Sequence, residues 1–512
     1  MKPVFKELEV CVMEESFKEL KEMLAEITDI GSAAAVLGWD QAVNMPPGGA
    51  PARGRQLAAL GKVTHEKLIN PRVGELLKVL QTHEQSLDYN SNESSLIRNT
   101  RIKYNKAVNV PTEFAGRWQS ATSESFDIWL KARPANNFKM VEPYLKKNFD
   151  MCKEYAEFFP GYEHPLDPMM DNHDYGMKAS NIREIFSNLR KEMVPIVESI
   201  TSQEPADDSF MKLGFEGKKQ LEFGESVVKA FGYDFNRGRQ DMAPHPFTIS
   251  FALGDVRITT RIQEHFLGSA LFGTLHEAGH AMYEQGGAPS LDGTPLRGGT
   301  SIGVHESQSR LWENIVGRSR PFWQHYYPGL QKHFPEHLGN VELNSFYRGI
   351  NKVQKSLIRV EADEVTYNLH VMMRFDFECS VLEGSLDVSE LPEAWKDRME
   401  SDIGIRPKDD ADGVMQDIHW YNGIIGYFQG YTLGNIMSAQ FYDAAVKEHP
   451  EITEEIGQGK FSTLHDWLKQ NIYQHGSKFT ANELLERVTG NGLDVAPYIN
   501  YLKKKYGELY DL

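Results

Sequence analysis

Apolar residues at helical spacing are the feature of this sequence that most constrains its fold. Stripes with steps of three and four residues recur along the chain, and such stripes form the buried face of a helix. The clearest are Phe17, Leu20, Leu24 and Ile27; Leu145, Phe149 and Cys152; and Ile182, Ile185, Phe186 and Leu189. Ser180 precedes the third stripe and is its expected N-cap. The chain is therefore predicted to be mainly α-helical.

One segment departs from the helical pattern. Apolar and polar residues alternate from 247 to 251 and again from 256 to 259, with Leu-Gly-Asp between the two runs. Alternation with a period of two, interrupted by a short turn, is typical of a β-hairpin. We therefore expect a small sheet in an otherwise helical chain.

The sequence HEAGH at residues 276–280 follows this hairpin and lies in a helical stretch. Residues four apart on a helix differ by only about 40° around its axis, so His276 and His280 present both imidazoles to one point. Two such nitrogens can share a zinc ion. Glu277 lies beside them, where a base can take a proton from the water that the metal activates. The motif predicts a metal site with Glu277 as general base.

A third ligand is expected from a second helix. Catalytic zinc takes three protein ligands and leaves a fourth position for water. After a glycine-rich loop, a second predicted helix carries Glu306 in its first turn, and the loop is long enough to bring this helix antiparallel to the first. Glu306 is therefore the predicted third ligand. His305 is the alternative, but neighbours on a helix point in different directions, so we expect His305 to pack beside the site.

The composition excludes several classes of function. The formal net charge of −17 would repel a phosphate backbone, so nucleic-acid binding is set aside. No stretch approaches the roughly 18 to 20 apolar residues that span a bilayer, and the first residues lack the apolar core of a signal peptide. The cysteines Cys11, Cys152 and Cys379 lie far apart, which suits a reducing compartment. We expect a cytoplasmic protein without membrane contact.

Six motifs in order along the chain carry a resemblance to a known family. They are HPF at 245–247, DVRIT at 255–259, HEAGH at 276–280, HESQ at 305–308, IRVEAD at 358–363 and GVMQDIHW at 413–420, and the N-terminal LGWDQAVNMPPGGAPARGRQ at 37–56 is also typical. Over nearly its whole length the chain resembles metallocarboxypeptidases of the carboxypeptidase Taq family. These enzymes are similar in architecture to neurolysin and angiotensin-converting enzyme.

The resemblance implies a fold, an activity and a set of ligands. The fold would be a single two-lobed helical peptidase domain over residues 1–512, with a deep groove between the lobes, and the family commonly forms homodimers. The activity would be removal of single residues from peptides with a free C-terminus. His276, His280 and Glu306 would bind zinc, with cobalt as a possible substitute, and Glu277 would be the general base.

The motifs at the hairpin imply contacts to the substrate. In enzymes of related architecture a histidine upstream of HEXXH reaches a substrate carbonyl, and His245 fits that position. The alternative is a histidine that caps backbone groups of the hairpin. The hairpin would offer its edge to an extended peptide and pair with the peptide backbone. Asp255 and Arg257 either belong to this surface or form an ion pair that holds the hairpin.

A carboxypeptidase must also recognise a free terminal carboxylate, for which the fork of an arginine is best shaped. Arg359 in IRVEAD is the leading candidate. A structural ion pair of Arg359 with Glu361 or Asp363 is the alternative. Asp363 is also a candidate to accept a hydrogen bond from a ligand histidine and so fix its tautomer.

A late segment, QDIHWYNGIIGYFQGYTLGN at 416–435, carries His419, Tyr427 and Tyr431. Attack on a peptide carbonyl develops an oxyanion, and His419 and one of the tyrosines are the predicted donors that stabilise it. Family members more often have GYFPTY where this chain has GYFQGY, with Gln429 and Gly430 in place of Pro and Thr. Which tyrosine acts therefore stays open.

Two rival functions are compatible with the same residues. A zinc oligopeptidase that cuts peptides internally would use the same ligands, but it would tolerate an amidated C-terminus. A non-enzymatic helical scaffold is the rival of a different class. A relic of that kind usually loses the base or a ligand first, whereas all four residues are present here.

Overall fold

The computed structural model describes residues 2–512, with side chains from residue 12 onward. Contacts between residues divide the chain into two compact units, each built from three stretches. Unit 1 runs up to Asn109 and includes Phe215–Thr300 and Lys460–Thr480; unit 2 comprises Val110–Gly214, Ser301–Gly459 and Ala481–Leu512. The described residues are mainly helical with one small sheet, which confirms the predicted fold class. None of their helices has the length and apolar character needed to cross a membrane.

Unit 1 contains the sheet, β1–β3, and the helix that carries HEAGH. Its helices and strands are α1 (Lys2–Val43), α2 (Ala50–Leu68), α3 (Pro71–Val79), α4 (Gln81–Ser86), α5 (Asn92–Asn109), α10 (Gly217–Phe231), β1 (Gln240–Met242), β2 (Thr248–Ala252), β3 (Asp255–Thr260), α11 (Leu267–Gln285) and α20 (Ser462–Asn471). Leu20 and Leu24 of the first predicted stripe lie in α1 and are buried against apolar residues of α3 and α5. The periodicity of α1 therefore marked a buried face correctly.

The sheet has the strand order β1-β3-β2. Strands β2 and β3 pair antiparallel across the turn at residues 253–254, which confirms the predicted hairpin. The register shifts between Ser250 and Ala252, as at a β-bulge. Strand β1 pairs parallel with β3 and was not predicted, because three residues are too few to show alternation. Both β1 and β2 are edge strands of this sheet.

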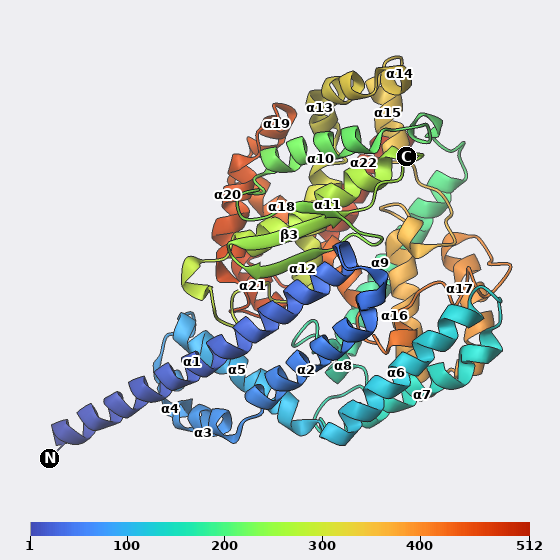
Figure 1. The fold of residues 1–512 in the computed structure, drawn as a ribbon. Helices are drawn as coiled ribbons and strands as arrows, with labels where there is room; N and C mark the ends of the chain where they lie inside the picture. Colours follow the sequence, from blue (N-terminus) through green and yellow to red (C-terminus); the bar gives the residue numbers. More distant parts are fainter. Residues whose placement is uncertain (1) are drawn as a thin grey trace. The chain divides into compact units, whose positions relative to one another are not determined.

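Helix α11 lies against the sheet. It packs on β2 and β3 and also on α10, so residues on most sides of the helix are buried (Figure 1). The helix ends at Gly286, where a Cβ atom would come within 2.6 Å of the Tyr473 side chain. Helix α11 is thus held along its length by the sheet and at its end by this close approach.

The regular elements described in unit 2 are all helices. They are α6 (Thr112–Ala132), α7 (Phe138–Glu157), α8 (Asp167–Met170), α9 (Ala179–Thr201), α12 (Ile302–Arg310), α13 (Arg320–His333), α14 (Pro335–Leu338), α15 (Leu343–Ile350), α16 (Tyr367–Glu383), α17 (Leu391–Ile403), α18 (Gln429–Glu448), α19 (Ile452–Gly457), α21 (Ala481–Thr489) and α22 (Ala496–Tyr510). The other two predicted stripes lie in α7 and α9 and are largely buried, as expected.

The start of α9 differs from the prediction. Ser180 is not the N-cap, because the helix begins one residue earlier, at Ala179. The carboxylate of Asp167 accepts a hydrogen bond of 2.8 Å from the N–H of Ala179. An acid from α8 therefore caps the helix in place of the local serine.

Helices α12 and α18 pack closely against each other. A Cβ atom at Gly434 of α18 would lie 2.5 Å from the Cβ of Glu306 on α12, so only glycine permits this approach. Directly after α12, residues Leu311–Val316 form a π-helix, in which the N–H of Gly317 bonds the carbonyl of Trp312 at 2.9 Å. Such wide turns are rare and occur frequently at functional sites.

The cysteines fit the expectation of unpaired thiols as far as the structure describes them. Cys152 and Cys379 are free and buried. Burial raises the pKa of both thiols, so neither is a reactive thiolate near neutral pH. The side chain of Cys11 lies outside the described residues.

Candidate metal centre

Helix α11 positions the two histidines of HEAGH. The helix runs without a break from Leu267 to Gln285, so the four-residue spacing brings His276 and His280 to the same side. Their ring centroids are 4.9 Å apart and the ring planes cross at 84°. This is the arrangement that the spacing of the motif predicts.

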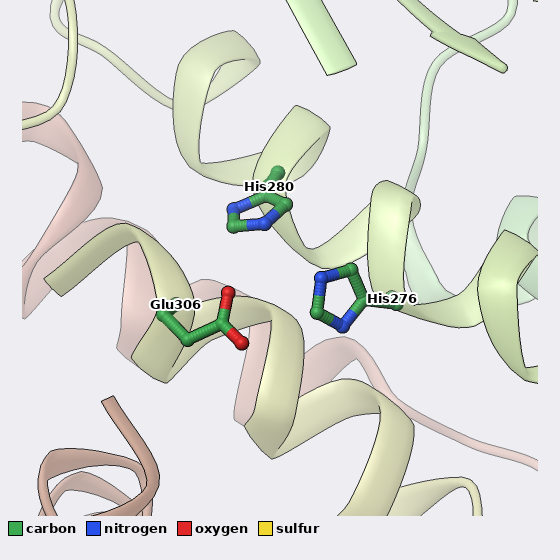
Figure 2. Close-up of side chains that lie close together, drawn as sticks. All are labelled: His276, His280 and Glu306. Atoms are coloured by element: carbon green, nitrogen blue, oxygen red, sulfur yellow. The ribbon is translucent and has the colours of Figure 1, made fainter. Parts of the chain in front are cut away.

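Helix α12 supplies a carboxylate. Ser301 Oγ accepts the N–H of Val304 at 3.1 Å, which gives the helix a regular N-cap. Glu306 follows one turn later and is only 5% exposed. One ligand atom from each of His276, His280 and Glu306 lies within 4.8 Å of the other two. Figure 2 shows the two imidazoles and the carboxylate near one another.

The chemistry of this donor set fits a divalent metal. Two imidazole nitrogens and one carboxylate oxygen are a known ligand set of catalytic zinc, and three ligands leave a position for water. Among the described residues, this is the one group of histidine, cysteine or acidic side chains close enough to hold an ion. Glu306, which the sequence favoured, is part of this group and His305 is not.

Glu277 is held by the sheet. The hydroxyl oxygen of Thr248 on β2 lies 2.7 Å from Glu277 Oε2 and 2.9 Å from the backbone carbonyl oxygen of the same residue. The hydroxyl has one proton and donates to one of these acceptors at a time. Glu277 itself is 6% exposed. Thr248 was not among the residues predicted from the sequence, where it appeared only as a polar position of the hairpin.

Glu306 is held by an ion pair within its own helix. Arg310, four residues later, donates from Nε to Glu306 Oε1 at 2.7 Å and from Nη1 to Glu313 Oε2 at 3.1 Å. Burial disfavours the charge of Arg310, but the two carboxylates more than offset this, so its pKa lies above the ordinary value. Arg310 was also missed, although its spacing of four residues from Glu306 was a usable signal.

The hairpin residues resolve one alternative. Arg257 donates from Nε and Nη2 to both carboxylate oxygens of Asp255, at 2.8 and 2.7 Å. The guanidinium also lies over the rings of Trp39 and Phe251. The ion pair that holds the hairpin is therefore present. His245 is exposed and forms no hydrogen bond with any described residue, so the structure shows no capping role for it.

Arg359 is buried and has different partners from those expected. Its Nε and Nη2 donate to Asp417, with the shortest distance 2.7 Å, and its Nη1 donates to the hydroxyl of Tyr367 at 2.9 Å. Arg374 also bonds Asp417, at 2.6 Å. The expected alternative partners, Glu361 and Asp363, take no part. Burial would raise the pKa of Asp417, but the two arginines hold it well below the ordinary range.

Asp363 holds the turn that precedes α16. Its carboxylate accepts the backbone N–H groups of Gln354, Val365 and Thr366 and the hydroxyl of Thr366, at 2.7 to 3.2 Å. These bonds satisfy both carboxylate oxygens just before α16. The hypothesis of a bond to a ligand histidine is therefore corrected: local donors in the turn use the acceptor capacity of Asp363.

His419, Tyr427 and Tyr431 lie together at the start of α18. His419 Nε2 is 3.4 Å from the hydroxyl of Tyr431, and the rings of the two tyrosines are 5.6 Å apart. Burial lowers the pKa of His419 to about 4, although Asp417 opposes this shift. Burial also raises the pKa of both tyrosines. Near neutral pH the three side chains are therefore an uncharged imidazole and two protonated phenols.

Comparison with known proteins identifies the family of this chain. A family model described as carboxypeptidase Taq (M32) metallopeptidase matches residues 19–506. Thermostable carboxypeptidase 1 of Thermus thermophilus is 39% identical over 507 residues, covering 97% of this chain and 99% of its own. Thermostable carboxypeptidase 1 of Pyrococcus furiosus is 34% identical over 502 residues, covering 96% and 100%.

A solved structure is also similar to this chain in both fold and sequence. The crystal structure of the M32 carboxypeptidase from Deinococcus radiodurans superposes with a TM-score of 0.94 at 43% identity, and the match covers 97% of this chain and all of that one. The likeness extends over fold, length and sequence together. The chain therefore belongs to the carboxypeptidase Taq (M32) metallopeptidase family and is a metal-dependent enzyme that hydrolyses peptide bonds.

Proposed function

We propose that this enzyme releases single amino acids from the free C-terminus of peptides, with His276, His280 and Glu306 holding a zinc ion. The carrying observation is the approach of these three ligand atoms to within 4.8 Å of one another in a chain of this family. Zinc is the metal that this donor set suits best, and cobalt is expected to replace it. When bound, the ion polarises the scissile carbonyl and lowers the pKa of water.

Glu277 is the proposed general base. It takes a proton from the attacking water and returns it to the nitrogen of the leaving amino acid. Both proton transfers require a fixed orientation of the Glu277 carboxylate. The hydroxyl of Thr248, 2.7 Å from Oε2, supplies that restraint. Burial of Glu277 also limits competition from bulk water.

The substrate's terminal carboxylate is proposed to bind near Arg359. The Nε edge of this arginine already faces Asp417, so a carboxylate would use the remaining N–H bonds of Nη1 and Nη2. Arg359 and Arg374 share one carboxylate, which leaves an excess positive charge in this buried cluster. The exposed His245 and the edge strand β2 are the proposed contacts to the peptide backbone.

The oxyanion that forms at the carbonyl is proposed to meet a hydrogen-bond donor from the 419–431 segment. Tyr427 and Tyr431 keep their protons near neutral pH because burial raises the pKa of each. A protonated phenol can donate without releasing a charge into the site. His419 Nε2 lies 3.4 Å from the hydroxyl of Tyr431 and can orient it. The tyrosines are therefore the proposed donors, with His419 orienting Tyr431.

Mass spectrometry of digested peptides tests this function. The zinc-loaded enzyme should shorten a peptide by one residue at a time from its C-terminus, and amidation of that terminus should abolish turnover. Internal fragments, with amidated and free peptides cut alike, would favour an oligopeptidase instead. Glu277→Gln should bind zinc normally while hydrolysis falls by orders of magnitude. Unchanged turnover in this variant would refute the role of Glu277.

The assembly and location follow the family resemblance. We propose a cytoplasmic homodimer, to which the two free, buried thiols are suited because they need no oxidising compartment. Light scattering coupled to gel filtration tests the dimer directly. A mass of one 58.2 kDa chain at working concentration would contradict it.

A further inference from the structure

The last turn of α12 surrounds the carboxylate of Glu306 with fixed groups. Arg310 Nε is 2.7 Å from Glu306 Oε1, and Ser309 Oγ is 3.4 Å from Oε2. Across the helix interface, the backbone of Gly434 comes so close that a Cβ there would be 2.5 Å from the Cβ of Glu306. The backbone of α18 thus lies against the Cβ of Glu306, and Arg310 holds one of its carboxylate oxygens, while Ser309 bonds mainly the backbone carbonyl oxygen of Glu306, at 2.8 Å.

Arg310 is itself restrained from several sides. Its Nη1 donates to Glu313 at 3.1 Å, and Arg318 holds the other oxygen of Glu313 at 3.2 Å. The guanidinium lies 4.7 Å above the ring of Tyr367. Two acids and two arginines thus alternate from α12 through the π-helix to Arg318, with Glu306 at one end. A side chain fixed by ion pairs and a ring on one face keeps its direction without further partners.

We propose that Arg310 is a positioning residue that decides how Glu306 meets the metal. By holding one carboxylate oxygen, it leaves the other as the single ligand atom and keeps the carboxylate from chelating the ion with both. Glu313 serves by keeping Arg310 in place. The inference rests on the proposed zinc site. It assigns a positioning role to a residue outside both the HEXXH motif and the set of three proposed ligands. Outer residues of this kind typically change metal affinity about 10- to 100-fold.

The test compares Arg310→Lys and Arg310→Gln with a matched control, Arg190→Lys. Arg190 is also partly buried and bridges two acids, Asp376 and Asp402, at 2.6 and 3.1 Å, but these acids belong to no candidate metal group. Lysine keeps the charge at 310 without the fork. Zinc affinity is measured by competition with a chelator, and the visible spectrum of the cobalt-loaded protein reports the number of ligands.

Both Arg310 variants should bind zinc at least tenfold more weakly, and their cobalt spectra should lose intensity as the second oxygen joins the coordination. Arg190→Lys should change neither. Should Arg310→Gln fail to fold, Arg310→Lys and Glu313→Gln carry the comparison. Unchanged affinity and spectra in folded variants would overturn the role of Arg310 while leaving the zinc site intact. Absence of zinc binding by the unmodified protein would overturn the proposed function and this inference with it.

Discussion

The contact between Gly434 and Glu306 predicts the effect of a single added methyl group. In Gly434→Ala the new Cβ would lie 2.5 Å from the Cβ of Glu306 and 3.0 Å from its backbone carbonyl carbon, whereas ordinary contact begins at 3.4 Å. The closest atoms must therefore separate by about 0.9 Å, the difference between the first and last of these distances. No rotamer change relieves the clash, because both of these atoms are fixed to the backbone of α12.

The expected cost can be set against a known gain. Overpacking of a well-packed interface costs about 3 kcal/mol at the upper end of its usual range. Alanine in a helix interior returns about 1 kcal/mol relative to glycine. The net loss of stability should be about 2 kcal/mol. If Glu306 is a zinc ligand as proposed, a displacement of this size should also weaken zinc binding, since a site tolerates only about 0.5 Å of error.

Gly116→Ala is the matched control. Gly116 lies inside α6, and a Cβ there would meet no atom within 4 Å. Its replacement should raise stability by up to about 1 kcal/mol and leave zinc affinity unchanged. Thermal unfolding of the metal-free proteins and chelator competition measure both quantities. If Gly434→Ala were as stable as Gly116→Ala and bound zinc equally well, the close packing of α18 on α12 would be refuted as a restraint on Glu306.

Three further predictions follow from the site and its surroundings. Thr248→Val should lower kcat about tenfold or more by releasing Glu277, whereas Thr248→Ser should keep most of the activity; equal kcat for Val and Ser would contradict the restraint. Asp417→Asn leaves two buried arginines without their shared carboxylate and should cost about 3–5 kcal/mol, and an unchanged midpoint of urea unfolding would contradict this. Burial lowers the pKa of His370 from 6.5 to about 3, so the unfolded chain binds its proton first. Stability should therefore fall as pH drops from 6.5 toward 3, by at most about 1.4 kcal/mol per pH unit from this group. His370→Gln should flatten that decline in pH-dependent unfolding, and an unaltered slope would show that His370 does not cause it.

Local patterns explain what the sequence could predict. Three features depend only on residues close together in the sequence: the helical stripe at Leu20 and Leu24, the hairpin at 247–259 and the paired histidines of α11. Periodicity reports such contacts directly. The choice of Glu306 over His305 could also be made from the sequence, because it depends only on the directions in which neighbouring side chains point around one helix.

Partners distant in sequence explain what could not be predicted. Strand β1 is defined only by its pairing with β3. Asp167 caps α9 from twelve residues away, and Asp417 holds Arg359 from 58 residues away. In each case several acids in the sequence are equally suitable, and only the fold decides which one is close. The roles of Arg359 and Asp363 were uncertain for this reason.

The π-helical turn at Leu311–Val316 has a consequence for the length of the chain. Successive residues of an α-helix are rotated by about 100° around its axis. Deleting one residue here would convert the π-helical turn into an ordinary α-helical turn, and the residues that follow would be rotated around the helix axis relative to α12. Glu313 and Arg318 would then leave the side of the helix where Arg310 lies. Insertions and deletions elsewhere can be absorbed by surface loops. At this turn a change of one residue would alter the surroundings of Glu306, the proposed metal ligand, so we expect the number of residues between Glu306 and Arg318 to be constrained.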